Sequence, residues 1–320
     1  MAVEIGGDRL LAWGRRGLGL ARLSSGDLRG ALEHLHGAID LLDANSEATT
    51  TFAFGLDPLS TTRTACALAL QQLGQVESAR ESLELALQEA AAVNHSITHS
   101  YVLFRAGMFL IFVRRVEDVG RNAAELIALG RNNNYASWTR FGQMQKGWHM
   151  AHCGQVEEGL NLLHDTIESQ RSRDAHLFMP IMMVHEAELL VQFDRPSSAL
   201  ERLAEAEEAV SQQRQHLGLS ELHRVRALAL TAMGADAGTI RASIEIARRI
   251  AAEQGALSSR LRIALDAVCV HAGYFNSVHG GAVHGLTKVE RDELSAAVAA
   301  FPATASEIDL MAARDLLATS

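Results

Sequence analysis

Apolar and polar positions along the chain alternate with the 3.6-residue period of amphipathic α-helices, and short polar turns interrupt this pattern at regular intervals. Five successive turns lie 40 residues apart, and the first turn precedes this series by 48 residues. The reference residues of the six turns are Gly26, Gly74, Arg114, Gly154, Asp194 and Gly234. Self-similarity at a period of about 20–50 residues predicts an array of stacked structural repeats.

Each turn is predicted to join two helices of roughly 16–18 residues, about 25 Å long. The glycines of the turns are expected to adopt the left-handed conformation that ends a helix. Pro196 is predicted to open a second helix, where its missing N–H costs nothing. The predicted pairs are 9–24 with 27–43, 58–73 with 76–93, 96–113 with 116–131, 136–152 with 156–172, 176–192 with 196–213, and 218–233 with 236–253.

Small residues recur at two fixed distances from the turns. Seven residues before each turn are Gly19, Ala67, Gly107, Gly147, Ala187 and Ala227. Five residues after each turn are Ala31, Ala79, Val119, Gly159, Ala199 and Thr239. Two helices can approach closely only where the side chain at the crossing point is small. The pattern therefore predicts that the two helices of each pair cross at these positions.

The regular pattern fades after Gly255. A further first helix is predicted at 257–272, and a Gly/His-rich loop follows at 273–285. Helices predicted at 288–300 and 306–318 then cap the array, since terminal repeats must cover an otherwise exposed apolar face. We therefore expect helix pairs over 1–272, the loop, and capping helices over 286–320.

The composition agrees with helices and excludes several classes of protein. The chain is 48% hydrophobic with 5% aromatic residues, and its formal net charge is −9. An acidic chain without a basic stripe argues against direct nucleic-acid binding. No apolar stretch is long enough to cross a membrane, and the first residues lack the pattern of a signal peptide. Cys66, Cys153 and Cys269 are unclustered and are interpreted as buried small residues, so we expect a cytoplasmic protein.

Paired helices, small residues at the crossing points and a Gly-containing turn resemble the tetratricopeptide repeat, although the usual period of that repeat is shorter, 34 residues. This resemblance implies an all-α, right-handed superhelical solenoid with a period of 40 residues.

Four segments carry a closer resemblance. They are GLDPLSTTRTACALALQQLGQ (55–75), KGWHMAHCG (146–154), RASIEIARRIAAEQGALSSRLRIA (241–264) and DLMAARDLL (309–317). They are similar to the C-terminal tetratricopeptide-like region of bacterial multidomain adenylate/guanylate cyclases and of related signal-transduction ATPase regulators. No GxxxxGK[ST] motif occurs in the chain, so the resemblance transfers no catalytic residue. A cyclase or ATPase module, if any, is expected outside this chain, which is then either a separated fragment or a stand-alone scaffold.

In tetratricopeptide proteins one face of the first helices lines a concave groove. Residues thirteen, ten and six positions before each turn share that face, because such spacings fall on one stripe of a helix. The centre of this face is aromatic and Met-rich, flanked by Arg and Glu. The candidate groove residues are Tyr101, Phe104, Met108, Phe141, Met144, Trp148, Glu188 and Arg224. The alternative interpretation is that these side chains pack against one another in the core.

No residue set indicates catalysis, a cofactor or a metal. His95 and His99, and also His149 and His152, have spacings that can share a metal ion, but each pair lacks a third ligand. The histidines of the Gly-rich loop are expected to be solvated. There is no G-x-S-x-G motif. We therefore expect a non-enzymatic scaffold.

Two functions are compatible with this scaffold. The first is binding of a protein or peptide segment in the apolar groove, with a lost cyclase or ATPase domain as one candidate partner. The second is sensing of a small-molecule effector, which the related regulators' repeat domains are known to perform. The sequence does not indicate an oligomeric state.

Overall fold

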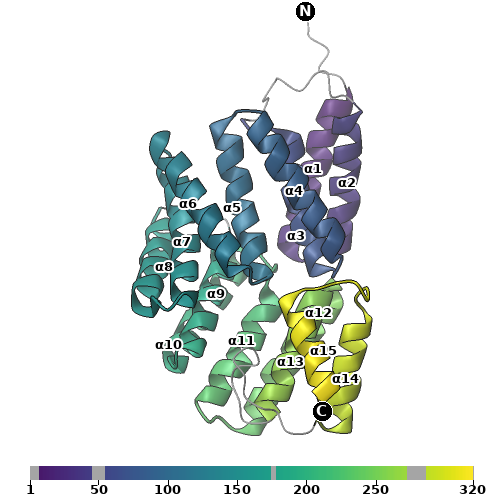
Figure 1. Cartoon of the computed structure of the whole chain (residues 1–320), viewed down its shortest axis with the longest axis vertical. Coiled ribbons are helices and arrows are strands. Elements are labelled where there is room, and N and C mark those ends of the chain that lie inside the picture. The colour runs from purple at the N-terminus through teal and green to yellow at the C-terminus, as the bar shows by residue number, and fades with distance from the viewer. Residues whose placement is uncertain (1–6, 45–54, 174–177, 272–285, 320) are drawn as a thin grey trace, which may run out of the picture. The chain divides into compact units, whose positions relative to one another are not determined.

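The computed structural model describes residues 7–44, 55–173, 178–271 and 286–319. Within these ranges the chain forms fifteen helices and no strands, which confirms the predicted all-α class (Figure 1). The helices are α1 (Gly7–Ser25), α2 (Leu28–Asp43), α3 (Pro58–Gln72), α4 (Val76–Ala92), α5 (Ser96–Phe112), α6 (Val116–Asn132), α7 (Ala136–His152), α8 (Val156–Arg171), α9 (Met179–Gln192), α10 (Pro196–Gln213), α11 (Leu219–Ala232), α12 (Ala237–Gln254), α13 (Leu257–His271), α14 (Lys288–Ala299) and α15 (Ile308–Thr319).

The chain divides into two compact units, which we describe separately. The N-terminal unit holds residues 1–71 and 75–149, and the C-terminal unit holds residues 72–74 and 150–320. The right-handed superhelix predicted over 1–272 spans both units and stays a prediction. Consecutive helices pack as pairs within each unit, for example α1 with α2 and α9 with α10.

All six predicted turn residues have a positive φ. The values are 85° at Gly26, 75° at Gly74, 56° at Arg114, 88° at Gly154, 60° at Asp194 and 69° at Gly234. This left-handed conformation ends the first helix of each pair, and glycine adopts it at no steric cost. Arg114 and Asp194 adopt it as well, although a Cβ atom disfavours it. The turn pattern predicted from the sequence is therefore confirmed at all six positions.

The second helices begin in two ways. Asp27 and Asp236 accept hydrogen bonds from the backbone N–H groups of Gly30 and Thr239, both at 3.0 Å, and so cap α2 and α12. The corresponding N-cap residues of the other second helices make no side-chain cap hydrogen bond; they are Gln75, Arg115, Gln155 and Arg195. Pro196 is the first residue of α10, as predicted. Capping is thus less uniform than the left-handed turn before it.

The crossing of α1 and α2 shows why small residues are required. A Cβ atom added to Gly19 would lie 2.6 Å from Leu35 Cγ and 3.2 Å from the carbonyl oxygen of Ala31. The first contact is too close for carbon and the second is tight, and Leu35 is fully buried. Gly107 on α5 is close to a different helix: an added Cβ would lie 2.1 Å from the side chain of Gln145 on α7, the first helix of the next pair. The predicted crossing within a pair is therefore seen at Gly19, and Gly107 is small for a contact between pairs.

The capping helices agree with the prediction, whereas one of the expectations about the cysteines changes. The capping helices form over Lys288–Ala299 and Ile308–Thr319, close to the predicted ranges. The Gly/His-rich loop at 273–285 lies outside the described residues. Cys66 is buried, and its burial raises the pKa of the thiol to about 12. Cys153 is exposed, so the prediction that it is buried was wrong; it follows the last residue of α7, where the chain turns.

Two glycines of α1 provide a matched test of the crossing. Gly19→Ala is expected to lower the free energy of unfolding by about 1–3 kcal/mol, because the added methyl group overpacks the contact with α2. Gly17→Ala is expected to raise it by about 0.5–1 kcal/mol, because an added Cβ meets no atom within 4 Å and alanine favours the helix. Urea unfolding followed by circular dichroism measures both. Equal stabilisation by the two substitutions would contradict the close crossing.

Candidate binding site

The structure buries the six apolar groove candidates. All six belong to α5 or α7 of the N-terminal unit. Their exposed fractions are 8% for Tyr101, 2% for Phe104, 2% for Met108, 6% for Phe141, 1% for Met144 and 3% for Trp148. A peptide groove needs exposed side chains on its floor. These residues do not form an open apolar groove here, and a groove role for them would require the surrounding helices to separate.

Aromatic packing accounts for part of this burial. The ring centroids of Phe104 and Phe141 lie 4.2 Å apart, and both rings also contact Trp138, at 6.1 and 5.6 Å. Tyr101 meets Trp138 edge to face at 6.1 Å. Such aromatic pairs add about 0.5–1.5 kcal/mol each beyond their buried area. The alternative interpretation, that these residues pack against one another, therefore describes the aromatic members of the set.

The two charged groove candidates lie together in the C-terminal unit. Arg224 Nη2 is 2.6 Å from Glu188 Oε1, and Arg224 Nε is 2.7 Å from Glu221 Oε2. Arg224 Nη1 also pairs with Asp266. One buried guanidinium thus binds carboxylates from α9, α11 and α13, and these three carboxylates raise its pKa against the opposing effect of burial.

A second arginine extends this network to α15. Arg262 Nη1 lies 3.2 Å from Glu221 Oε2, and its Nη2 lies 2.8 Å from Asp309 Oδ2. Burial would raise the pKa of Glu221, but the positive charges of Arg224 and Arg262 outweigh burial and hold it below its usual value. The same helices pack in the order α9, α11, α13 and α15. The network therefore connects α9, α11 and α13, the first helices of successive predicted pairs, with the capping helix α15.

A pocket opens in the C-terminal unit, lined by residues outside this network. It has a volume of about 290 Å³ and lies between α8, α9 and the start of α10. Its charged lining consists of His164, Glu186, Arg195, Glu201, Arg202 and Glu205, while Leu160 and Leu190 supply apolar wall. The volume lies near the lower end for ligand pockets, about 300–1,000 Å³. It therefore suits one long side chain or a small molecule.

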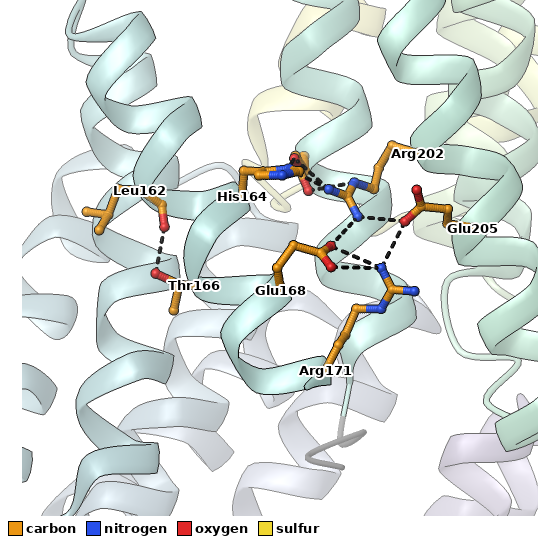
Figure 2. A network of polar contacts seen from close by, with 8 residues as sticks. Leu162, His164, Thr166, Glu168, Arg171, Arg202 and Glu205 are labelled. Carbon is orange, nitrogen blue, oxygen red and sulfur yellow. Dashed lines mark hydrogen bonds and ion pairs between the residues drawn. The ribbon is translucent and has the colours of Figure 1, made fainter. Parts of the chain in front are cut away.

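Arg202 is the centre of the polar network beside this pocket (Figure 2). Its Nη1 donates to Glu168 Oε1 at 2.8 Å and to Glu205 Oε2 at 2.9 Å. Arg171 bridges the same two carboxylates, at 3.0 and 2.9 Å. Figure 2 shows both guanidiniums pointing at Glu168 and Glu205. Arg202 is therefore held in place and its positive charge is shared among several carboxylates.

Glu186 is the buried carboxylate of this pocket. Its Oε2 lies 2.9 Å from Arg202 Nε, but this oxygen has no aligned hydrogen-bond donor. Its Oε1 lies 2.9 Å from His164 Nδ1, and the same ring nitrogen lies 2.5 Å from Arg202 Nη2. Burial raises the pKa of Glu186, although Arg202 and His164 act in the opposite direction. The positive charge around Glu186 is therefore too small to offset its burial.

Three histidines of the predicted pairs contact groups outside their own pair. His99 pairs with Glu125 at 3.2 Å, while His95 Nδ1 lies 2.8 Å from the hydroxyl of Thr98. His149 Nδ1 lies 3.0 Å from the carbonyl oxygen of Val116. Over the part of the chain that the structure describes, no group of three or more His, Cys, Asp or Glu side chains is placed to hold a metal ion. In the same residues no helix is long and apolar enough to cross a membrane.

The pocket residues were not among the sequence candidates, although the sequence carries a signal for them. The partners of these networks lie about one repeat apart: 34 residues separate Glu168 from Arg202, and 42 separate Arg224 from Asp266. Charged residues inside otherwise apolar helices, such as Glu186 in MPIMMVHEAELLVQ, are a second signal. A search of the sequence for opposite charges about one repeat apart would have identified residues of both networks.

Comparisons with known proteins add no identification. No protein-family model matches the chain, and a comparison with curated proteins gave no match. The resemblance to the repeat region of cyclases and ATPase regulators is therefore an expectation from the sequence.

The buried network gives a stability prediction. Arg224→Met is expected to lower the free energy of unfolding by about 3–5 kcal/mol, because it leaves Glu188, Glu221 and Asp266 buried without their shared cation. Arg249→Met is the control: Arg249 pairs with Glu253 on the exposed surface of α12, and its loss is expected to cost less than about 1 kcal/mol. Urea unfolding of the full chain measures the difference. Similar losses for the two variants would show that the network contributes no more than a surface pair.

Proposed function

We propose that this chain is a non-catalytic helical-repeat module that binds a protein or peptide segment. We further propose that the pocket between α8, α9 and α10 receives a basic side chain of that segment. The observation that carries the proposal is Glu186, a buried carboxylate of the pocket whose Oε2 pairs with Arg202 Nε without an aligned hydrogen bond and whose pKa is raised by burial.

The charge distribution around the pocket supports a cationic guest. The cations of the lining are engaged: Arg202 pairs with Glu168, Glu186 and Glu205, and Arg195 pairs with Glu157. Glu201 lies at the exposed side of the pocket and has no ion pair with a described residue. An incoming ammonium or guanidinium group would therefore meet two carboxylates with remaining acceptor capacity, and charge-assisted hydrogen bonds are the strong ones.

The rest of the chain is consistent with such a partner. The formal net charge of −9 favours association with basic segments, because complementary charge raises the rate of encounter. The pocket volume of about 290 Å³ accommodates one Lys or Arg side chain. The cytoplasmic location and the role in signal transduction belong to the same proposal, and they rest on the composition and on the sequence resemblance.

Phage display of random dodecapeptides, selected for binding to the full chain, tests the proposal. Selected peptides are expected to contain Lys or Arg, and replacing that residue with norleucine is expected to weaken binding in fluorescence polarisation. Glu201→Gln is expected to weaken binding about tenfold, since a charge-assisted hydrogen bond contributes about 1.5–3 kcal/mol. Glu208→Gln is the matched control, because Glu208 lies on the same helix, bonded to Gln212 and outside the pocket lining. Selection of neutral or acidic peptides, or equal binding by the two variants, would contradict the proposal.

The same complex is expected to weaken as the pH falls through the raised pKa of Glu186. The pKa of Glu186 lies above its ordinary value of about 4.3 in the free protein, and a bound cation would lower it. Binding then releases protons, so the affinity rises with pH. Polarisation titrations over acidic to neutral pH measure the effect, and the same titrations are made on a His164→Gln variant, which lacks the neighbouring imidazole. An affinity that rises on acidification in that variant would contradict a role for Glu186.

A further inference from the structure

Three leucines on one side of α1 are about half exposed. Their exposed fractions are 53% for Leu10, 50% for Leu11 and 55% for Leu18. Exposed small residues lie between and beside them, and the spacings place the whole set on one face of the helix. This set, which we call the outer face of α1, consists of Leu10, Leu11, Gly14, Gly17, Leu18 and Ala21. It contains no polar or charged side chain, although it is open to solvent.

The corresponding positions of the later repeats are buried. Gly14 lies twelve residues before the turn at Gly26, and Gly17 lies nine residues before it. The residues equivalent to Gly14 are Thr62, Val102, Gly142, Met182 and Leu222, and those equivalent to Gly17 are Ala65, Arg105, Gln145, His185 and Val225. All ten are buried. The outer face of α1 therefore has the position of a packing face, but it is exposed.

In the later repeats the second helix of the preceding pair packs against this face. Val102 on α5 forms a buried cluster with Ala86 and Ala90 of α4. On α7, a Cβ atom added to Gly142 would lie 2.8 Å from Ile127 Cγ1 of α6. The equivalent faces thus bind a neighbouring helix through small and aliphatic side chains. The outer face of α1 has the same chemistry, so a helix is the occupant that it fits.

The outer face of α1 is complementary to a second copy of itself. When two such helices run antiparallel about a two-fold axis at Gly14, Leu10 lies level with Leu18 of the second copy, and Leu11 lies level with Gly17 of the second copy. Leucines then pack against leucines or into the space above a glycine, as in antiparallel helix pairs. At Gly14 no side chain keeps the two backbones apart, and a Cβ atom there would meet no atom of its own chain within 4 Å.

The charges at the two ends of α1 favour the antiparallel arrangement. Asp8 is exposed in its first turn, and Arg22 is exposed in its last turn, where it pairs with Asp27. An antiparallel pair places Asp8 near Arg22 of the second copy at both ends and also opposes the two helix dipoles. Arg15 lies between these residues but extends toward α2, where its guanidinium is beside Gly37. A parallel pair would instead bring like charges together.

We propose that two copies of this chain associate through the outer face of α1, as an antiparallel helix pair about a two-fold axis. A contact between two single helices is smaller than the about 800 Å² per partner of a standard interface, so the expected dissociation constant is about 10–100 μM. The face belongs to the N-terminal unit, whereas the pocket proposed for basic side chains belongs to the C-terminal unit. Self-association and peptide binding are therefore independent proposals.

Sedimentation equilibrium of the full chain over about 5–500 μM measures the association. Leu18→Glu is expected to weaken it about tenfold or more, because the dimer would bury two carboxylates without counter-charges. Its melting temperature is expected to equal that of the monomeric wild type, since the side chain is exposed in the monomer. Met311→Glu is the matched control: Met311 is 52% exposed on α15, and its substitution is expected to leave the association unchanged.

Cysteine cross-linking tests the orientation of the two helices. Leu10→Cys and Leu18→Cys are made separately in a Cys153→Ser background, because Cys153 is exposed. After equal amounts of the two variants are mixed and oxidised with diamide, the mixed disulfide is expected to predominate. In the antiparallel pair the two different positions are level, whereas identical positions lie about 12 Å apart along the axis, beyond the reach of a disulfide. The Cys153→Ser chain alone measures the background of cross-linking.

Three outcomes would overturn the inference. The first is a wild-type chain that stays monomeric up to about 500 μM. The second is an association that Leu18→Glu leaves unchanged, or that Met311→Glu weakens equally. The third is a predominance of disulfides between identical variants, which would exclude the antiparallel pair. None of these results bears on the binding of basic peptides by Glu186 and Glu201, so the two proposals fail separately.

Discussion

The left-handed residue that ends each first helix is the constraint on which the rest of the structure depends. It turns the chain back so that the second helix packs against the first, and its recurrence every 40 residues sets the repeat length. Arg114 and Asp194 adopt this conformation without the freedom of glycine, with φ values of 56° and 60°. The packing of the flanking helices therefore imposes the turn where the residue itself does not favour it.

The repeat spacing explains why helix positions could be predicted from the sequence. The predicted and observed helices agree within one to three residues at most ends, because turn chemistry and apolar periodicity are local properties. The largest difference is at α9, which begins at Met179 rather than at 176, after Phe178 in a left-handed conformation. A phenylalanine in that conformation carries no local sequence signal.

The candidate site was harder to predict for a physical reason. Periodicity shows which residues share a helix face, but whether that face is covered depends on side chains that arrive from other repeats. Trp148 and Phe104 fall on the predicted face and are nevertheless buried. Conversely, no local motif marks Arg202 or Glu186, because the two residues pair across separate helices, α10 and α9. Charge pairs at one-repeat spacing carry the information that single-helix periodicity lacks.

The ion network of the C-terminal unit also determines how that unit can come apart. Helical repeat arrays commonly fray from an end, since each repeat contacts only its neighbours. Here Asp309 on α15 holds Arg262, Arg262 contacts Glu221 on α11, and Arg224 links Glu221 to Glu188 on α9. Detaching the last helix would leave Arg262 short of a counter-charge in a buried setting. Because α9, α11, α13 and α15 share these charges, we expect them to unfold cooperatively rather than one after another.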